Sequence, residues 1–411
     1  MAVSNNPVEM QGNFKNVYDK AKLHTAIPQW CVIQDRFKFE TRQATGNFYA
    51  QGVVLQRENG ATYSPSSGAA SVSPTLNASV AGFVGQAQIE GYGIFLRARI
   101  DYLVAAKAAQ AGEQAFAQAT AAVLKNLKES HQYRLECSLL YGRDGLGIVS
   151  SNTSGALVIT AATWATGIWA TGLKGAILEA FTGTGDSVTQ HNGDLTIASV
   201  SVSLKTVTVT GTSAAVVAND VLYFKGARTT TGFNECPGLF RILSNTGTLF
   251  NISAASYELW QASSYPVSGN LSLTAIMQAA AVGMSFGLQK AILLCSPTKF
   301  GQLASDEAAL RRFVQDTPNA KRGVKGITFM LGQVEVEIVA HPLVRDGHAM
   351  LLAEDSIHRI GSTDVTMALP GSSEKLTVHV TDQAVFEFRS MSDQGIYSDS
   401  PAQCVLMTGI T

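Results

Sequence analysis

The stretch LVAAKAAQAGEQAFAQATAAVLKNLKESHQYRLECSLLY, from Leu103 to Tyr141, determines how the rest of the chain is interpreted. Its many alanines favour a helix by intrinsic propensity. Apolar residues recur at steps of three and four, which places them on one stripe of that helix. At roughly 1.5 Å per residue, an unbroken helix of this length would extend for about 60 Å. The residues expected on its core-facing stripe are Phe116, Val123, Leu127 and Leu135.

The segment before this helix, residues 41–100, is predicted to form a long hairpin. Residues 52–57 are typical of a strand, and Asn59-Gly60 indicates a tight turn because this pair tolerates positive φ. Residues 64–81 are rich in Ser, Gly and Ala, which favours a mobile loop or an extended limb. Alternation over residues 94–100 predicts the returning strand. An isolated hairpin is barely stable in water, so we expect it to need a partner surface, such as another subunit.

Residues 1–40 are interpreted as an N-terminal arm. A short helical pattern ends before Ile27-Pro28, and the segment is too short to have a core of its own. We therefore expect the arm to lie on the main body or on a neighbouring molecule. The apolar residues of its helical pattern are Phe14, Val17, Tyr18 and Ala21.

The chain after the helix is mixed to residue 182 and then becomes all-β. Short alternating segments between residues 183 and 272 predict a small barrel or sandwich, inserted between mixed regions. Helix-like and strand-like patterns resume over residues 273–375, and residues 376–411 are predicted to supply closing strands. The fold class expected from this order is α+β with an all-β insertion.

Composition favours a protein that binds other protein. Charged residues make up 15% of the chain, against about 25% in typical soluble domains. The net charge of −1 supplies no global basic field to recruit nucleic acid. The five cysteines are scattered without a CxxC pair, which indicates neither a disulfide framework nor a zinc site. No secretory signal or membrane-spanning run is apparent, so we expect a cytoplasmic protein without membrane contact.

Catalytic and metal-binding motifs are weak. Gly283-Met-Ser285-Phe-Gly287 matches the GxSxG pattern of α/β-hydrolases, with possible acid and base partners later in the chain. However, Ser285 lies in an Ala-rich helical run rather than after an apolar strand, so a small residue at a close helix contact is favoured over a nucleophile. His341 and His348 lack a third ligand at a usual spacing. We expect no enzyme activity, cofactor or metal; the candidate partners of Ser285 are Asp346, Asp355, His358 and His379.

One basic cluster leaves two interpretations open. Arg311-Arg312 and the residues from Lys321 to Lys325 could meet nucleic acid or a neighbour's carboxylates, or they could form an ordinary solvated loop. No aromatic residues are interleaved with these charges to provide a stacking platform for bases.

The order of these parts resembles the major capsid proteins of tailed bacteriophages, the Hong Kong 97-like fold that encapsulins share. Residues 46–58 resemble the rising strand of the family's E-loop, and residues 115–142 resemble its spine helix and exit. Residues 392–401 and 408–410 resemble its closing strands. The resemblance implies an N-terminal arm, an E-loop, a peripheral domain built on the spine helix, and an axial domain. The implied domain ranges are 1–40 for the arm, 41–100 for the E-loop, 101–182 for the spine helix and the start of the peripheral and axial domains, 183–272 for the insertion, 273–375 for the axial domain and 376–411 for the strands returning to the peripheral domain.

The implied function is a major capsid protein that forms pentamers and hexamers of an icosahedral shell around double-stranded DNA. The resemblance also implies location in the virion capsid after assembly in the host cytoplasm. Expected partners are other copies of the chain, non-specifically bound DNA, a portal, a separate scaffolding protein and, as an open question, a decoration protein. Alternatives are an encapsulin-like compartment and, more remotely, a serine hydrolase using Ser285. The candidate E-loop contacts with other subunits are Tyr49, Arg57, Glu58, Asn59 and Tyr63.

The sequence makes one chemical prediction about the assembled shell. Some members of the family join an E-loop lysine to an asparagine of another subunit, but this chain has no lysine between Lys38 and Lys107. We therefore expect shells heated in denaturant to give a single monomer band on a denaturing gel. A ladder of covalent oligomers would contradict the prediction.

Overall fold

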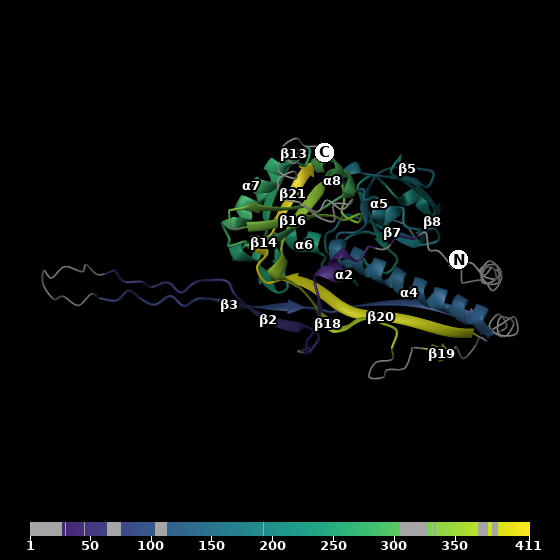
Figure 1. The fold of residues 1–411 in the computed structure, drawn as a ribbon, viewed down its shortest axis with the longest axis horizontal. Helices are drawn as coiled ribbons and strands as arrows, with labels where there is room; N and C mark the ends of the chain where they lie inside the picture. The colour runs from purple at the N-terminus through teal and green to yellow at the C-terminus, as the bar shows by residue number, and fades with distance from the viewer. Residues whose placement is uncertain are drawn as a thin grey trace, which may run out of the picture.

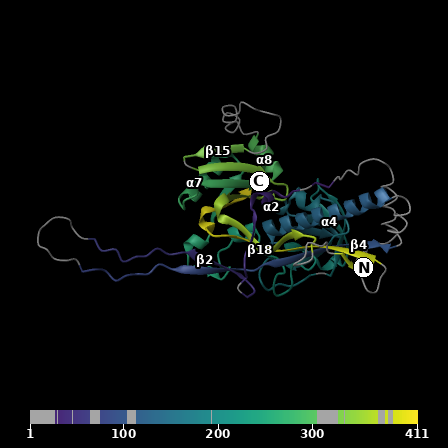
Figure 2. The ribbon, with the colours of Figure 1, turned by 60° about the horizontal axis from the view of Figure 1, so that its bottom comes forward.

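The computed structural model describes residues 27–28, 30–44, 46–63, 75–102, 113–191, 193–304, 327–332, 334–368, 377–379 and 385–411. Figure 1 shows an extended layer that contains helix α4 and strand β20, with a compact body of sheets packed above it. At the end of this layer that lies away from α4, a hairpin projects far beyond the body. Figure 2 shows the same projection from a second direction. Among the described helices, none is long and apolar enough to span a bilayer.

Helix α4, Glu113–Tyr141, is the long helix expected from the sequence. Residues 103–112 and the side chain of Phe116 lie outside the described part of the chain. Leu127 and Leu135 are 6% and 1% exposed, and Val123 is half-buried. The helix packs on β4 and β20 along its length, and residues 135–141 are buried all round where the compact body covers them. Both the extended sheet layer and the compact body therefore pack against this one helix.

A five-stranded sheet lies under α4. Its path is β1-β18-β20-β19, and β4 pairs antiparallel with β20. We predicted residues 94–100 to be the returning strand of the hairpin, and this was wrong. Apolar and polar residues alternate along β4 because one face of the strand packs toward α4. The backbone of β4, however, pairs with β20 near the C-terminus and not with the hairpin. The strand bounds are β1 Phe39–Thr41, β4 Tyr92–Asp101, β18 Ile357–Thr366, β19 Thr377–His379 and β20 Val385–Ser398.

The predicted β-rich insertion contains a closed barrel, but its bounds differ from 183–272. The barrel begins directly after α4 and ends at Phe224, in the order β10-β5-β6-β9-β8-β7. Three of its strands precede residue 183, in a stretch where tryptophan, glycine and threonine obscure the alternation. The bounds are β5 Gly147–Thr153, β6 Ala156–Ile159, β7 Ile177–Thr182, β8 Leu195–Ser201, β9 Thr206–Gly211 and β10 Asp220–Phe224.

The rest of the predicted insertion belongs to other parts of the fold. A short segment beneath the body carries α6 Leu239–Leu243, β11 Thr248–Leu249 and β12 Ile252–Ser253, and β13 Ser263–Gly269 joins a second sheet. That six-stranded sheet has the order β13-β21-β17-β14-β16-β15. Its remaining strands are β14 Lys290–Cys295, β15 Ile327–Leu331, β16 Val334–Ala340, β17 His348–Ala353 and β21 Val405–Ile410, and the helices beside it are α7 Leu273–Met284 and α8 Pro297–Ala304.

The chain crosses twice between the two sheets, which corrects the expected C-terminal division. Strand β18 lies within the range 273–375 but joins the five-stranded sheet, and β21 lies within 376–411 but joins the six-stranded sheet. The short helical turns Glu354–Ser356 and Pro401–Gln403 redirect the chain at the two crossings. The other short helices are α2 Val32–Arg36 and α5 Thr166–Trp169, with 3₁₀ turns at Ala161–Thr163, Ser213–Ala215 and Glu258–Trp260.

A clasp of buried charged groups holds α2 against the body. Glu136 of α4 accepts hydrogen bonds from the backbone N–H of Ile33 at 2.6 Å and from Nε2 of His341 at 3.1 Å. At the other end of α2, Arg359 donates to the carbonyls of Gln34 at 2.9 Å and Phe37 at 3.0 Å. Both Glu136 and Arg359 are at most 2% exposed. The clasp therefore satisfies backbone groups at both ends of a helix too short to be stable alone.

The core stripe of α4 can be tested with two aspartates. Leu127→Asp would place an unpaired charge in the core at a cost of several kcal/mol, and we expect it to abolish soluble subunits. Lys125→Asp changes a side chain that is 66% exposed and pairs with Glu129 on the same helix, so folding should survive. The measurement is the soluble fraction and the thermal unfolding midpoint; equal tolerance of both substitutions would contradict the assignment.

The clasp can be tested with Arg359→Met. This change leaves the carbonyls of Gln34 and Phe37 without their buried donor, and we expect a loss of about 3 kcal/mol in the free energy of unfolding. Amide hydrogen exchange should accelerate over residues 31–41. The control is Arg36→Met, because Arg36 makes its ion pairs with Glu337 and Glu354 at the surface. If both variants exchange alike, Arg359 does not hold the segment.

Candidate assembly surface on the projecting hairpin

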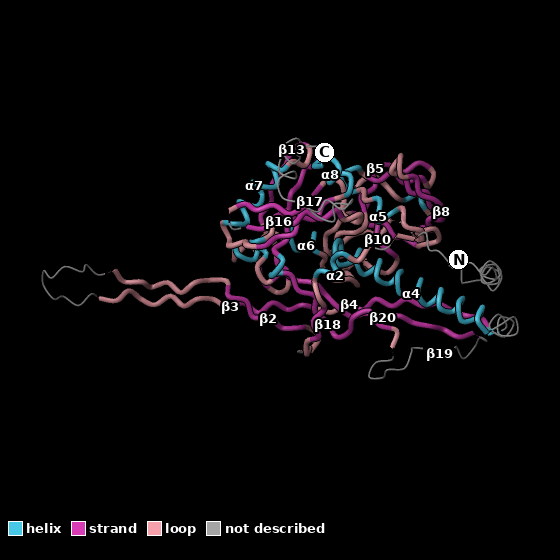
Figure 3. Tube along the Cα trace, viewed as in Figure 1, coloured by secondary structure: helices cyan, strands magenta, loops and turns pink. Residues whose placement is uncertain are grey.

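The base of the projecting hairpin is part of the core. Strands β2, Tyr49–Val54, and β3, Val84–Ile89, pair antiparallel with Tyr49 opposite Ile89 and Val54 opposite Val84. Tyr49, Ala87 and Ile89 are buried. The returning strand of the predicted hairpin is thus β3 rather than β4. Figure 3 shows the two halves of the hairpin continuing side by side beyond these strands, away from the rest of the molecule.

Contacts with the segment from Phe250 to Tyr257 fix the direction of the hairpin. The ring of Phe83 stacks on Tyr257, with centroids 4.7 Å apart, and the N–H of Gln88 donates to the carbonyl of Phe250 at 3.0 Å. Gly85 packs closely on Leu55, because a Cβ there would lie 2.9 Å from the Cδ1 of Leu55 and would require that side chain to shift. The segment from Phe250 to Tyr257 therefore supports β3 along one side.

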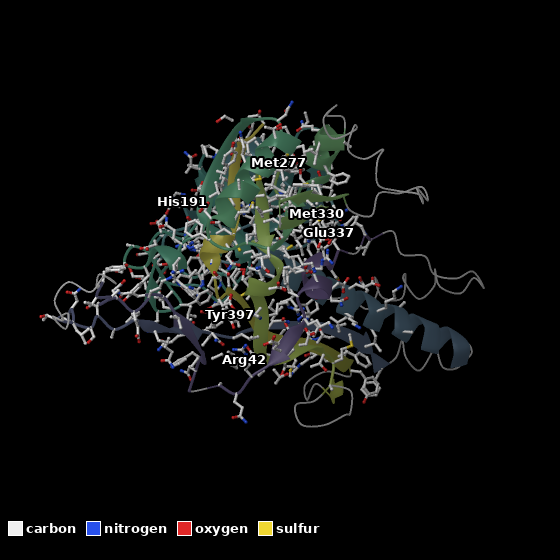
Figure 4. All side chains as sticks on the ribbon, turned by 60° about the vertical axis from the view of Figure 1, so that its left-hand side comes forward. Arg42, His191, Met277, Met330, Glu337 and Tyr397 are labelled. Atoms are coloured by element: carbon white, nitrogen blue, oxygen red, sulfur yellow. The ribbon has the colours of Figure 1, made fainter. Side chains whose placement is uncertain are left out.

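Two side chains hold the opposite strand. Arg42 and Tyr397 both donate hydrogen bonds to the side-chain oxygen of Gln51 on β2, the second at 3.4 Å. Figure 4 shows Arg42 and Tyr397 lying close together, one from the segment after β1 and the other from β20. Burial raises the pKa of Tyr397 above its usual value, which keeps its hydroxyl protonated as a donor. The base is consequently tied both to β20 and to the segment that follows β1.

The turn predicted at Asn59-Gly60 is wrong, because the hairpin continues past it. The N–H of Asn59 donates to the carbonyl of Val80 at 2.8 Å, and the N–H of Val80 donates back at 2.6 Å. Further out, the N–H of Asn77 donates to the hydroxyl of Thr62 at 2.8 Å. Gly60 does adopt positive φ, at +130°, but within the paired excursion. The tip lies outside the described residues, between 63 and 75.

The outer hairpin exposes apolar side chains that the described residues leave largely or partly uncovered. Tyr63 is 94% exposed and Leu76 is 78% exposed, although both are apolar residues on a thin excursion without a core. Such an apolar strip is typical of a surface that binds another protein. Sequence reasoning missed the residues of the returning side, which lacked a recognisable strand pattern. The exposed apolar side chains are Val54, Tyr63, Leu76, Val80, Phe83 and Val84.

The five predicted contact residues fall into two groups. Arg57, Glu58, Asn59 and Tyr63 are exposed on the outer hairpin. Tyr49 is only 5% exposed at the base, where burial raises the pKa of its hydroxyl. Tyr49 therefore serves the core, and the candidate surface is formed by the other four residues with the exposed apolar side chains.

The geometry around Ser285 does not support a hydrolase. Ser285 caps the C-terminal end of α7, and its hydroxyl donates to the carbonyl of Ala281 at 3.3 Å. His358 instead contacts Asp399 at 3.4 Å and Glu40 at 3.7 Å, and its hydrogen bond to Asp399 raises its pKa. The side chain of His379 is not among those described. A nucleophile elbow requires a strand-to-helix turn, which this site lacks.

The two neighbouring histidines, His341 and His348, likewise supply no metal site. His341 donates to Glu136, and His348 contacts the hydroxyl of Tyr141 at 2.9 Å, where burial lowers the pKa of His348 to about 3. Across the described residues, no group of three or more His, Cys, Asp or Glu side chains is arranged to hold a metal ion. The basic cluster at residues 311–325 lies outside the described part of the chain.

Comparisons with known proteins identify the fold. No protein-family model matches the chain, and no curated protein matches it. Among solved structures, the capsid asymmetric unit of cyanophage A-1(L) aligns over 96% of this chain and 97% of that chain, with a TM-score of 0.56 and 12% identity. The capsid of the empty GTA particle aligns over 96% and 94%, with a TM-score of 0.52 and 5% identity. The long helix packed on a five-stranded sheet, the projecting hairpin and these alignments over 96% of the chain together show that the chain has the Hong Kong 97-like capsid fold.

Proposed function

We propose that this chain is a major capsid protein that self-assembles into pentamers and hexamers of an icosahedral shell around phage double-stranded DNA. The observation that carries the proposal is the projecting hairpin, whose apolar residues find no cover within the described part of the chain. A surface of this kind is stable when a second copy buries it, and repeated head-to-tail contacts close into rings. The alignment with capsid proteins over nearly the whole chain supports the same function.

The proposal assigns the outer hairpin to contact with an adjacent subunit. Arg57, Glu58 and Asn59 would supply polar contacts, and Tyr63 an aromatic anchor. Aromatic residues are enriched among the residues that dominate binding energy at interfaces. Charged side chains at such a contact contribute more to register than to affinity. The base, held by the segment 250–257 and, through Gln51, by Arg42 and Tyr397, would set the direction in which the hairpin reaches its neighbour.

Further partners follow from the function rather than from a described site. The DNA contact would be non-specific and modest. With a net charge of −1, the chain has no overall positive charge that would attract DNA phosphates strongly. A portal and a separate scaffolding protein would take part in assembly in the host cytoplasm, and whether a decoration protein binds the shell stays an open question. Enzyme activity has no role in this function.

Electron microscopy of the purified protein tests the proposal directly. We expect closed shells with five-fold and six-fold clusters, containing DNA when they are isolated from virions. Shells filled with a protein cargo would favour the encapsulin-like alternative. Single globular particles under all assembly conditions would contradict both.

The contact surface is tested by Tyr63→Asp combined with Leu76→Asp. These side chains are the most exposed apolar residues of the described hairpin, so subunit folding should be unchanged, whereas shell formation should fall at least tenfold because the buried contact would acquire two charges. The readouts are sedimentation of shells and the thermal midpoint of subunits. The matched control is Leu204→Asp on the barrel, where Leu204 is 70% exposed. Normal shells from the double variant would show that this surface is not an interface.

A further inference from the structure

His358 lies between two carboxylates where β1, β18 and β20 run side by side. Its Nε2 is 3.4 Å from Asp399, the residue that follows β20, and its Nδ1 is 3.7 Å from Glu40 of β1. The imidazole is 26% exposed, and both carboxylates are exposed to a larger fraction. Negative charges on either side of one imidazole stabilise its protonated form.

The same groups continue to the contact that holds the base of the hairpin. Glu40 also accepts a hydrogen bond from Arg42 at 3.1 Å, and Arg42 donates to the side-chain oxygen of Gln51 on β2. On the other side, the imidazole of His358 stacks on Tyr397 with ring centroids 5.4 Å apart, and the Tyr397 hydroxyl donates to that Gln51 oxygen at 3.4 Å. We call Arg42, Tyr397 and Gln51 the hairpin clamp; its first two members are labelled in Figure 4. His358 is therefore linked to both sides of the clamp.

Loss of the proton from His358 changes the balance of charge beside the clamp. While the imidazole is charged, it attracts Glu40 of β1 and Asp399 after β20 at the same time. Once it is neutral, Asp399 loses this ion pair, and the ion pair of Glu40 with Arg42 remains. The two carboxylates then repel each other without the cation between them. The strands that carry Arg42 and Tyr397 are consequently drawn together less strongly.

We propose that His358 is a pH-sensitive switch for the hairpin, which tightens the hairpin clamp on Gln51 when it is protonated and loosens the base of the hairpin when it is neutral. The switch lies within one subunit, so the inference does not rest on shell formation. It determines how firmly the hairpin is held in its direction before any other molecule binds.

The sign of the pH dependence follows from the groups that face the imidazole. The hydrogen bond to Asp399 is the largest cause that raises the pKa of His358 above 6.5, and Glu40 acts in the same direction, whereas burial and Arg42 lower it. A group whose pKa is raised by folding contributes stability that is complete below its unfolded pKa and is lost as the pH rises through its folded pKa. We therefore expect the loosening to begin above pH 6.5.

Other titrating groups can be separated from His358. Burial lowers the pKa of His131 to about 4 and that of His348 to about 3, so both stay neutral above about pH 6. Burial raises the pKa of Glu235 to about 7. Glu235 accepts from the N–H of Arg143, whose guanidinium contacts Tyr92 of β4. Because Glu235 titrates in the same range, it requires a control variant of its own.

Amide hydrogen exchange of full-length, dissociated subunits tests the switch at about pH 6 and about pH 8.5, after correction for the intrinsic effect of pH on exchange. We expect protection over residues 49–54 to fall about two- to fivefold at the higher pH, the size of an ion-pair contribution between partly exposed groups. His358→Gln keeps a neutral polar side chain and should remove this fall, whereas Glu235→Gln should retain it. A fall of the same size in the His358→Gln variant, or none in the unchanged protein, would overturn the proposal.

A second measurement keeps the imidazole in place. Asp399→Asn removes the charge that most raises the pKa of His358, so we expect the midpoint of the loosening to move to lower pH. The His358 signal in an NMR titration of ¹³C-labelled histidines should move with it. The matched control is Asp194→Asn, a similarly exposed aspartate that pairs with Lys225 beside the barrel, and it should leave both midpoints unchanged. If Asp399→Asn moves the titration of His358 without moving the loosening, the imidazole does not control the hairpin.

Discussion

The buried hydrogen bonds of Glu136 connect the three parts of the molecule. Its carboxylate belongs to the long helix, accepts from the backbone of α2, and accepts from His341 beside the six-stranded sheet. The N–H of Leu343 donates to Nδ1 of His341, which leaves the proton on Nε2 facing Glu136. A carboxylate with no exposed surface is costly unless each of its partners is present. The helix, the arm and the upper sheet must therefore fold together.

The two sheets are joined by the chain itself as well as by packing. The chain passes from β17 to β18 and again from β20 to β21, and each crossing leaves one sheet and enters the other. Before the start of β17, the backbone N–H of Arg345 donates to the hydroxyl of Tyr141 at 2.9 Å, while its guanidinium lies 4.0 Å from the Tyr141 ring and pairs with Asp144. A movement of the six-stranded sheet relative to the end of α4 would break these contacts. The body thus provides a rigid base from which the hairpin can project.

The hairpin itself follows a different principle. Its base is determined by burial within the chain, but its outer part exposes apolar residues and has few contacts beyond its own cross-strand hydrogen bonds. An isolated two-stranded hairpin is only marginally stable in water, so the exposed apolar side chains of this part favour a partner surface.

Local patterns in the sequence were sufficient to predict the long helix, the presence of a β-rich insertion and the order of the parts, because alanine content and apolar spacing report local conformation and which face is buried. They did not determine which strands pair. Arg99 and Glu387 lie 288 positions apart yet share an ion pair across β4 and β20, and no local pattern in β4 identifies that partner. The barrel's early strands, the burial of Tyr49 and the continuation of the hairpin past Gly60 were likewise decided by the tertiary structure. The physical reason is that periodicity shows that a face is buried, whereas only long-range packing selects what buries it.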